Sequence, residues 1–203
     1  MASRLDLDKS DSLTFETDRN GIIRSIGENN WNLFAKENGA PELRADTVVG
    51  RSLFDFIEGT RLRNHIRSVM EQIAQDPNWV WVLPFRCDTP DRKRVIRQSV
   101  KPVYWENQCT GFLFQSVDQY SQQRPPLGIY DFQKLRNLGT MDCHLPIIAM
   151  CSWCQKVQRD AGEDDWISAE DYYVSGGRSE VRISHGICNQ CLNNMEKPFL
   201  NKT

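Results

Sequence analysis

Apolar and polar residues alternate near the start of the chain, a pattern that is typical of strands. Residues 12–25, "SLTFETDRNGIIRS", therefore predict two short strands, joined at Asn20-Gly21, a favoured two-residue hairpin turn. The next segment, "NNWNLFAKENG", predicts a short helix that begins at Asn29 or Asn30 as its N-cap. The N-terminal part thus starts as a strand pair followed by a helix.

The apolar spacing then changes to the period of a longer helix. Leu62, Ile66, Val69 and Ile73 fall on one face at 100° per residue, which predicts a helix over about residues 61–75. From residue 78 the alternation returns in three segments, "NWVWVLPFRC", "RVIRQSVKPVYW" and "CTGFLFQSV", which predict three more strands. Strands at both ends with helices between them indicate an α+β fold, a five-stranded antiparallel sheet with helices on one side.

This element order, with the phrase "VVGRSLFDFI" just before the long helix, resembles a PAS domain. The resemblance covers residues 12–118. It implies a sensory fold that binds a small molecule or cofactor between sheet and helices, or that serves as a dimerisation module. Residues 1–11 are an N-terminal tail, and residues 119–140, with Pro-Pro and Gly, are interpreted as a linker.

Composition and charge narrow the classes of function. The chain is 39% apolar and 26% charged, which is ordinary for a globular protein, and its net charge of -2 is too low to favour nucleic acid as the main partner. Its longest apolar runs are of strand length, so we expect no membrane span. The start, "MASRLDLDKSDS", has no apolar segment typical of a secretory signal, and we expect a cytoplasmic location.

The cysteines carry the clearest chemistry. Two C-x-x-C pairs, Cys151 with Cys154 and Cys188 with Cys191, lie in the segment 141–203. That segment is too short to be stable on an apolar core alone, and two such pairs supply the four thiolates of a tetrahedral zinc site. We therefore interpret residues 141–203 as a small zinc-stapled module.

The same tail resembles the cysteine-rich "CSWCKK…SHGICP.C" tail that is attached to PAS sensors and signalling kinases in bacteria. Here it reads "CSWCQK", then Trp166, then "SHGICNQC". Gln155 replaces a basic residue and Asn189 replaces the usual proline, and neither position is a candidate ligand. The resemblance implies a bacterial protein of signal transduction.

His185 offers an alternative fourth ligand, because it could take the place of one thiolate or donate a hydrogen bond to one. Cys143 and His144, just upstream, are interpreted as structural or exposed. His65, on the long helix, is a candidate haem ligand by resemblance to some PAS domains, although it lies at the rim of the apolar face. The ligand of the PAS-like domain is otherwise unknown.

Three functions follow from these features. The first is a sensory or signalling adaptor without enzymatic activity, which acts through a protein partner or as a homodimer and carries structural zinc. The second is a thiol oxidoreductase that uses Cys151 and Cys154, which would need an exposed thiolate of low pKa. The third is a zinc–thiolate redox switch, because thiolates are the oxidisable form of cysteine.

Overall fold

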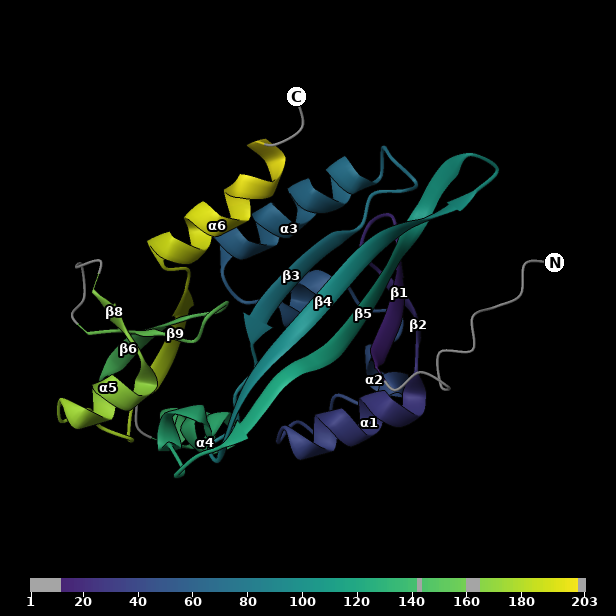
Figure 1. The fold of residues 1–203 in the computed structure, drawn as a ribbon. Coiled ribbons are helices and arrows are strands. Elements are labelled where there is room, and N and C mark those ends of the chain that lie inside the picture. The colour runs from purple at the N-terminus through teal and green to yellow at the C-terminus, as the bar shows by residue number, and fades with distance from the viewer. Residues whose placement is uncertain (1–11, 142–143, 160–164, 201–203) are drawn as a thin grey trace. The chain divides into compact units, whose positions relative to one another are not determined.

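The computed structural model describes residues 12–141, 144–159 and 165–200 (Figure 1). The predicted tail at residues 1–11 and Cys143 lie outside the described residues. The chain divides into two compact units. Unit 1 comprises Met1–Ile57, Arg63–Phe85 and Arg94–Ser121, and unit 2 comprises Glu58–Leu62, Arg86–Lys93 and Gln122–Thr203.

Unit 1 is built on a five-stranded antiparallel sheet, in the order β2-β1-β5-β4-β3. Its strands are β1 (Leu13–Asp18), β2 (Ile23–Ile26), β3 (Trp81–Arg86), β4 (Arg92–Trp105) and β5 (Gln108–Gln123). Between β2 and β3 the chain forms α1 (Glu28–Glu37), α2 (Ala45–Val48), a 3-10 turn (Leu53–Phe56) and α3 (Thr60–Ile73). This order confirms the expected α+β, PAS-like architecture.

The turn between β1 and β2 forms where the sequence places it. The Asp18 carboxylate accepts hydrogen bonds from the backbone N–H groups of Asn20 and Ile22, each at 2.9 Å. Gly21 adopts φ 84°, a left-handed conformation that costs glycine little. The strand pair at the start of the chain is therefore confirmed.

The start of α1 differs from the prediction. The N-cap is Gly27, which offers no side-chain hydrogen bond, and the helix begins at Glu28 rather than after Asn29 or Asn30. The cause is tertiary: the Gly27 N–H donates to the Thr14 carbonyl at 3.0 Å, so the connection to β1 fixes where the helix starts.

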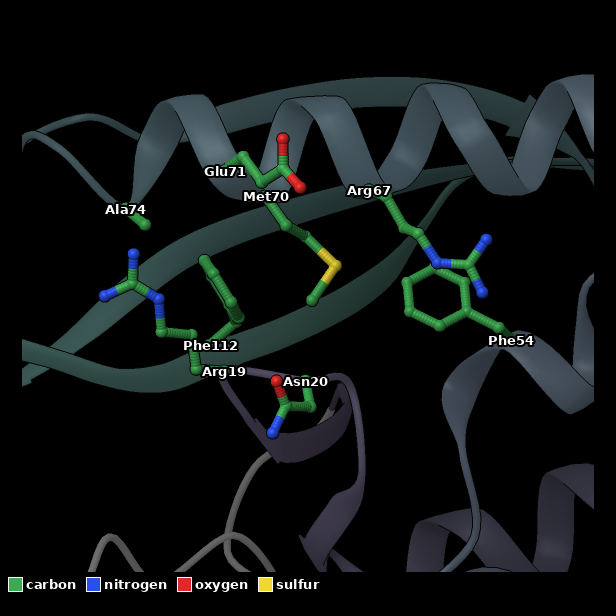
Figure 2. A pocket seen from close by; sticks show the side chains of 8 residues that line it. All are labelled: Arg19, Asn20, Phe54, Arg67, Met70, Glu71, Ala74 and Phe112. Carbon is green, nitrogen blue, oxygen red and sulfur yellow. The ribbon is translucent and has the colours of Figure 1, made fainter.

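The apolar face of α3 packs as its periodicity predicts. Val69 and Ile73 are fully buried, and Met70 is buried beside Phe112 of β5 (Figure 2). Val100 of β4 is equally buried. The core of unit 1 thus lies between α3 and the sheet.

The stretch interpreted as a linker is largely ordered structure. β5 continues to Gln123, and a 3-10 turn (Gly128–Tyr130) and α4 (Phe132–Met141) follow. Pro-Pro and Gly led to the interpretation of residues 119–140 as a linker, but Ile129 and Tyr130 are almost completely buried. These two side chains lie in the core of unit 2, and their burial there explains why this segment forms regular structure.

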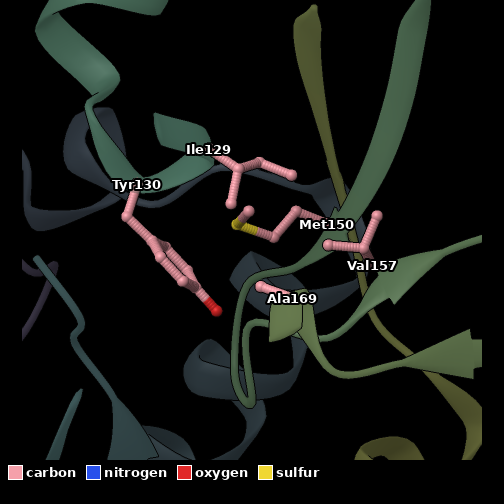
Figure 3. Packing of buried hydrophobic residues seen from close by; sticks show 5 residues of the cluster. All are labelled: Ile129, Tyr130, Met150, Val157 and Ala169. Atoms are coloured by element: carbon pink, nitrogen blue, oxygen red, sulfur yellow. The ribbon is translucent and has the colours of Figure 1, made fainter. Parts of the chain in front are cut away.

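Unit 2 contains a second, mixed sheet in the order β8-β7-β6-β9. Its strands are β6 (Ile147–Cys151), β7 (Val157–Gln158), β8 (Trp166–Ile167) and β9 (Arg182–Gly186). β9 runs parallel to β6, whereas β7 is antiparallel to both β6 and β8. A small core of Ile129, Tyr130, Met150, Val157 and Ala169 packs beside it (Figure 3).

Two helices complete unit 2, α5 (Ala169–Val174) and α6 (Asn189–Leu200). The Ser168 hydroxyl caps α5 by accepting the Asp171 N–H at 3.0 Å, and Gly176 follows with φ 87°. Among the described residues, every helix is too short or too polar to cross a lipid bilayer.

Candidate metal centre

Two neighbouring parallel strands bring the C-x-x-C pairs together. Cys151 ends β6 and lies opposite Gly186, the last residue of β9. Cys154 is in the turn that follows β6, while Cys188 and Cys191 lie just after β9, at the start of α6. Because parallel strands end at the same edge of a sheet, both pairs meet there.

The four sulfur atoms fit a tetrahedral metal ion. They all lie within 4.8 Å of one another, and Cys154 Sγ is 3.7 Å from Cys188 Sγ. Zinc–sulfur bonds of about 2.3 Å in a tetrahedron place the sulfur atoms about 3.8 Å apart, whereas a disulfide needs about 2.05 Å. The spacing is thus that of a metal centre, and this cluster could bind a metal.

Backbone donors point at the sulfur atoms. The Cys188 N–H donates to Cys151 Sγ at 3.5 Å, and the Cys191 N–H donates to Cys188 Sγ at 3.4 Å. Such N–H groups stabilise the negative charge of a thiolate. They come from the turn into α6, so the start of that helix contributes backbone donors as well as two of the candidate ligands.

The thiols also perturb each other. Hydrogen bonds from Cys154 and Cys191 lower the pKa of Cys151. The hydrogen bond to Cys151 raises the pKa of Cys154 to about 12, and it likewise raises the pKa of Cys191. The Cys151 thiolate is therefore favoured while the thiols of Cys154 and Cys191 resist deprotonation, and a bound cation would favour the thiolate form of both.

The cluster is shielded mainly by apolar groups. Cys151, Cys188 and Cys191 are buried, while Cys154 is only half-buried. Trp153, Trp166 and Ile187 pack against the cluster. Sequence reasoning noted Trp166 in the tail motif but missed Ile187, whose apolar character directly before Cys188 was the available signal.

His185 lies apart from the four sulfur atoms. It sits on β9 opposite Met150, three residues before Cys188, and the clustered ligand atoms are the four cysteine sulfurs. Its Nδ1 atom is 3.5 Å from the exposed carboxylate of Glu58, and its ring packs edge-on against Phe132 at 6.3 Å. The geometry therefore favours the all-cysteine set over the alternative with His185.

The other candidate ligand, His65, packs against an aromatic side chain. Its ring lies 6.0 Å from the ring of Trp81, in an edge-on arrangement. The upstream His144 is exposed, as expected. Neither residue belongs to the cysteine cluster.

Unit 1 has a cavity of about 210 Å³ between α3, the β1–β2 turn and β5 (Figure 2). Met70 points into it from α3, and the Arg67 guanidinium stacks over the Phe54 ring at 4.0 Å. The lining residues are Arg19, Asn20, Phe54, Arg67, Met70, Glu71, Ala74 and Phe112. His65 is not among them, and the volume lies below the usual 300–1,000 Å³ of ligand sites, so the haem hypothesis gains no support.

No protein-family model matches the chain, and no curated protein matches it. Among solved structures, it is similar to the Aer2 receptor of Vibrio cholerae, described as a dual PAS-heme oxygen sensor, with 16% identity and a TM-score of 0.42 over 54% of this chain and 95% of that one. It is also similar to the PAS domain of Bordetella pertussis BvgS, with 14% identity and a TM-score of 0.45 over 68% of this chain and 95% of that one. A PAS domain from Colwellia psychrerythraea gives 19% identity and a TM-score of 0.40 over 55% and 89%. These are similarities of fold, and what those proteins bind is a property of those proteins.

Proposed function

We propose that this protein is a sensory or signalling adaptor without catalytic activity, in which unit 1 receives a small ligand and unit 2 is stapled by structural zinc. The observation that carries the proposal is the gathering of four cysteine sulfurs within 4.8 Å of one another, with one pair at 3.7 Å. Four thiolates occupy all four coordination positions of a tetrahedral ion and leave none for an activated water. Output then takes place through a protein partner or a second copy of the chain.

The ligand set favours zinc or iron over other metals. A tetrahedral site of four sulfurs suits zinc or iron, and these two are separable by spectroscopy. Elemental mass spectrometry of the purified protein is expected to give one zinc per chain, and the visible spectrum is expected to show no absorption band. A thiolate–iron band or a haem band would replace this proposal with a redox or haem function, and the absence of any metal would remove it.

The cavity of unit 1 suggests the kind of ligand. Its floor, with Met70 and Phe112, is apolar, whereas Arg19, Arg67 and Glu71 lie where the lining is exposed. Two guanidinium groups against one carboxylate favour a small ligand with an apolar body and an anionic group. Benzoate and hexanoate are suitable probes: they are expected to raise the melting temperature of the protein but not that of Arg67→Gln. Arg97→Gln, an exposed position on β4 outside the lining, is the matched control.

A zinc–thiolate redox switch is a second candidate, favoured by the unequal burial of the ligands. Cys154 is the half-buried member, so an oxidant reaches it first. Two thiolates would form one disulfide while hydrogen peroxide and two protons become two water molecules, and zinc would be released. A zinc-sensitive dye that reports release under mild peroxide, reversed by added thiol, supports the switch; zinc that stays bound until the protein unfolds excludes it.

A further inference from the structure

A fully buried carboxylate lies in the loop that joins β3 to β4. The Asp88 side chain has no exposed surface, and two arginines neutralise it. Arg86 Nε donates to Asp88 Oδ1 at 2.9 Å, with a second contact from Arg86 Nη2, and Arg124 Nη1 donates to Oδ2 at 2.9 Å. Breaking either ion pair would leave a buried charge unpaired, which costs free energy, so we expect this cluster to stay formed whenever unit 2 is folded.

The backbone around this carboxylate is hydrogen-bonded to the first cysteine pair. The Arg86 N–H donates to the Trp153 carbonyl at 2.8 Å, and the Asp88 N–H donates to Gln155 Oε1 at 2.9 Å. Trp153 and Gln155 are the residues on either side of the ligand Cys154. The loop therefore contacts the metal-binding turn on both sides of one ligand.

The backbone of Gln155 adopts an unfavourable conformation, which hydrogen bonds from neighbouring residues can stabilise. It adopts φ 57°, an unfavourable region for a residue with a side chain, and its N–H donates to the Cys151 carbonyl at 2.9 Å to close the turn. Its side-chain oxygen is used as an acceptor. A basic residue, which the resembling tail has at this position, has no acceptor and could not make the bond to Asp88.

The same network reaches two further elements of unit 2. Arg124, which directly follows β5, also pairs with Glu170 of α5 at 3.0 Å and stacks over the Tyr130 ring at 4.4 Å. The Tyr130 hydroxyl in turn donates to the Gln155 carbonyl at 3.4 Å. The Gln155 side chain thus accepts a hydrogen bond from the Asp88 N–H, and the Gln155 backbone carbonyl accepts one from the Tyr130 hydroxyl.

We propose that Asp88 is a positioning residue for the metal centre, acting through Gln155, so that metal binding and the order of residues 86–91 are coupled. The inference rests on the proposed zinc site. Because coupling between two sites is reciprocal, the ordered loop tightens zinc binding by the same factor by which zinc stabilises the loop.

The test measures zinc affinity by competition with a chelator in the full chain and in three variants. Gln155→Met removes one hydrogen-bond acceptor and leaves the ion cluster intact, and Asp88→Asn weakens the cluster itself. Both are expected to bind zinc about 10–100-fold more weakly, as loss of an outer-shell contact does elsewhere. The control is Asp165→Asn. The exposed Asp165 carboxylate pairs with Arg159 at 3.3 Å and is not part of the Asp88 network, so the zinc affinity of this variant is expected to change by less than about twofold.

Hydrogen exchange of the zinc-bound proteins supplies a readout that general destabilisation of unit 2 does not produce. With zinc bound, amides in a peptide covering residues 86–93 are expected to exchange faster in Gln155→Met than in the wild-type protein, while peptides from α5 and β9 keep wild-type protection. If Asp88→Asn fails to fold, Gln155→Met decides the question. Wild-type affinity in Gln155→Met together with wild-type exchange of the loop in the zinc-bound variant overturns the inference while the zinc site stands; a wild-type protein that binds no zinc overturns the proposed function instead.

Discussion

Removal of the metal is the perturbation that most directly tests how unit 2 is held together. Unit 2 has few fully buried large apolar side chains, among them Ile129, Met150, Val157 and Val181. At ~1.5–3 kcal/mol for each such side chain, these four contribute about 6–12 kcal/mol. A structural zinc ion contributes about 10–16 kcal/mol of apparent free energy, and the whole stability of a typical domain is only about 5–15 kcal/mol. Chelation is therefore expected to unfold unit 2 at room temperature.

Hydrogen exchange and tryptophan fluorescence can measure the unfolding of unit 2 separately from that of unit 1. After chelation, peptides from β6, β9 and α5 are expected to exchange fully, while peptides from β1 and β5 of unit 1 keep their protection. Trp153 and Trp166, which pack on the cysteines, are expected to shift their emission to longer wavelength. Cys154→Ser is expected to reproduce the effect, whereas Cys109→Ser, in unit 1, is expected to keep full zinc content. Native exchange in unit 2 after proven removal of zinc would refute the reasoning.

Two further predictions test the sheet of unit 1 and the choice of ligands. Gly111→Ala places a Cβ 2.0 Å from the Thr17 carbonyl oxygen of the paired strand β1, so unfolding of unit 1 is expected to become easier by about 1–3 kcal/mol in urea denaturation, with zinc content unchanged; wild-type stability would contradict this packing. His185→Ala is expected to keep one zinc per chain with unchanged affinity, because its Nδ1 faces Glu58, and a variant that loses zinc would show that histidine replaces a cysteine ligand.

Local sequence patterns were sufficient for much of unit 1. The alternation before and after Asn20-Gly21 and the 3.6-residue period of Leu62, Ile66, Val69 and Ile73 depend only on neighbours in the chain, and both elements formed where expected. The start of α1 did not follow the local signal, because a hydrogen bond from Gly27 to Thr14 sets it. A contact between segments leaves no periodic trace in one sequence.

The cysteine ligands were likewise readable, since C-x-x-C spacing by itself lets two sulfurs turn toward one ion. The sequence could not choose between His185 and a fourth cysteine, because both lie within a few residues of each other and only the strand pairing separates them. The parallel register of β6 and β9 brings the two pairs to one edge while His185 lies opposite Met150.

The sequence by itself therefore determined the α+β class, the order of the elements in unit 1 and the four candidate metal ligands, because each is encoded in residues that are close together in the chain. Only the tertiary structure decided that the expected linker contributes Ile129 and Tyr130 to a core, and that Asp88 supports Gln155 from more than sixty residues away. A buried carboxylate and its partners are recognisable only when the chain has brought them together, since isolated Asp, Arg and Gln residues look like ordinary surface residues in a sequence.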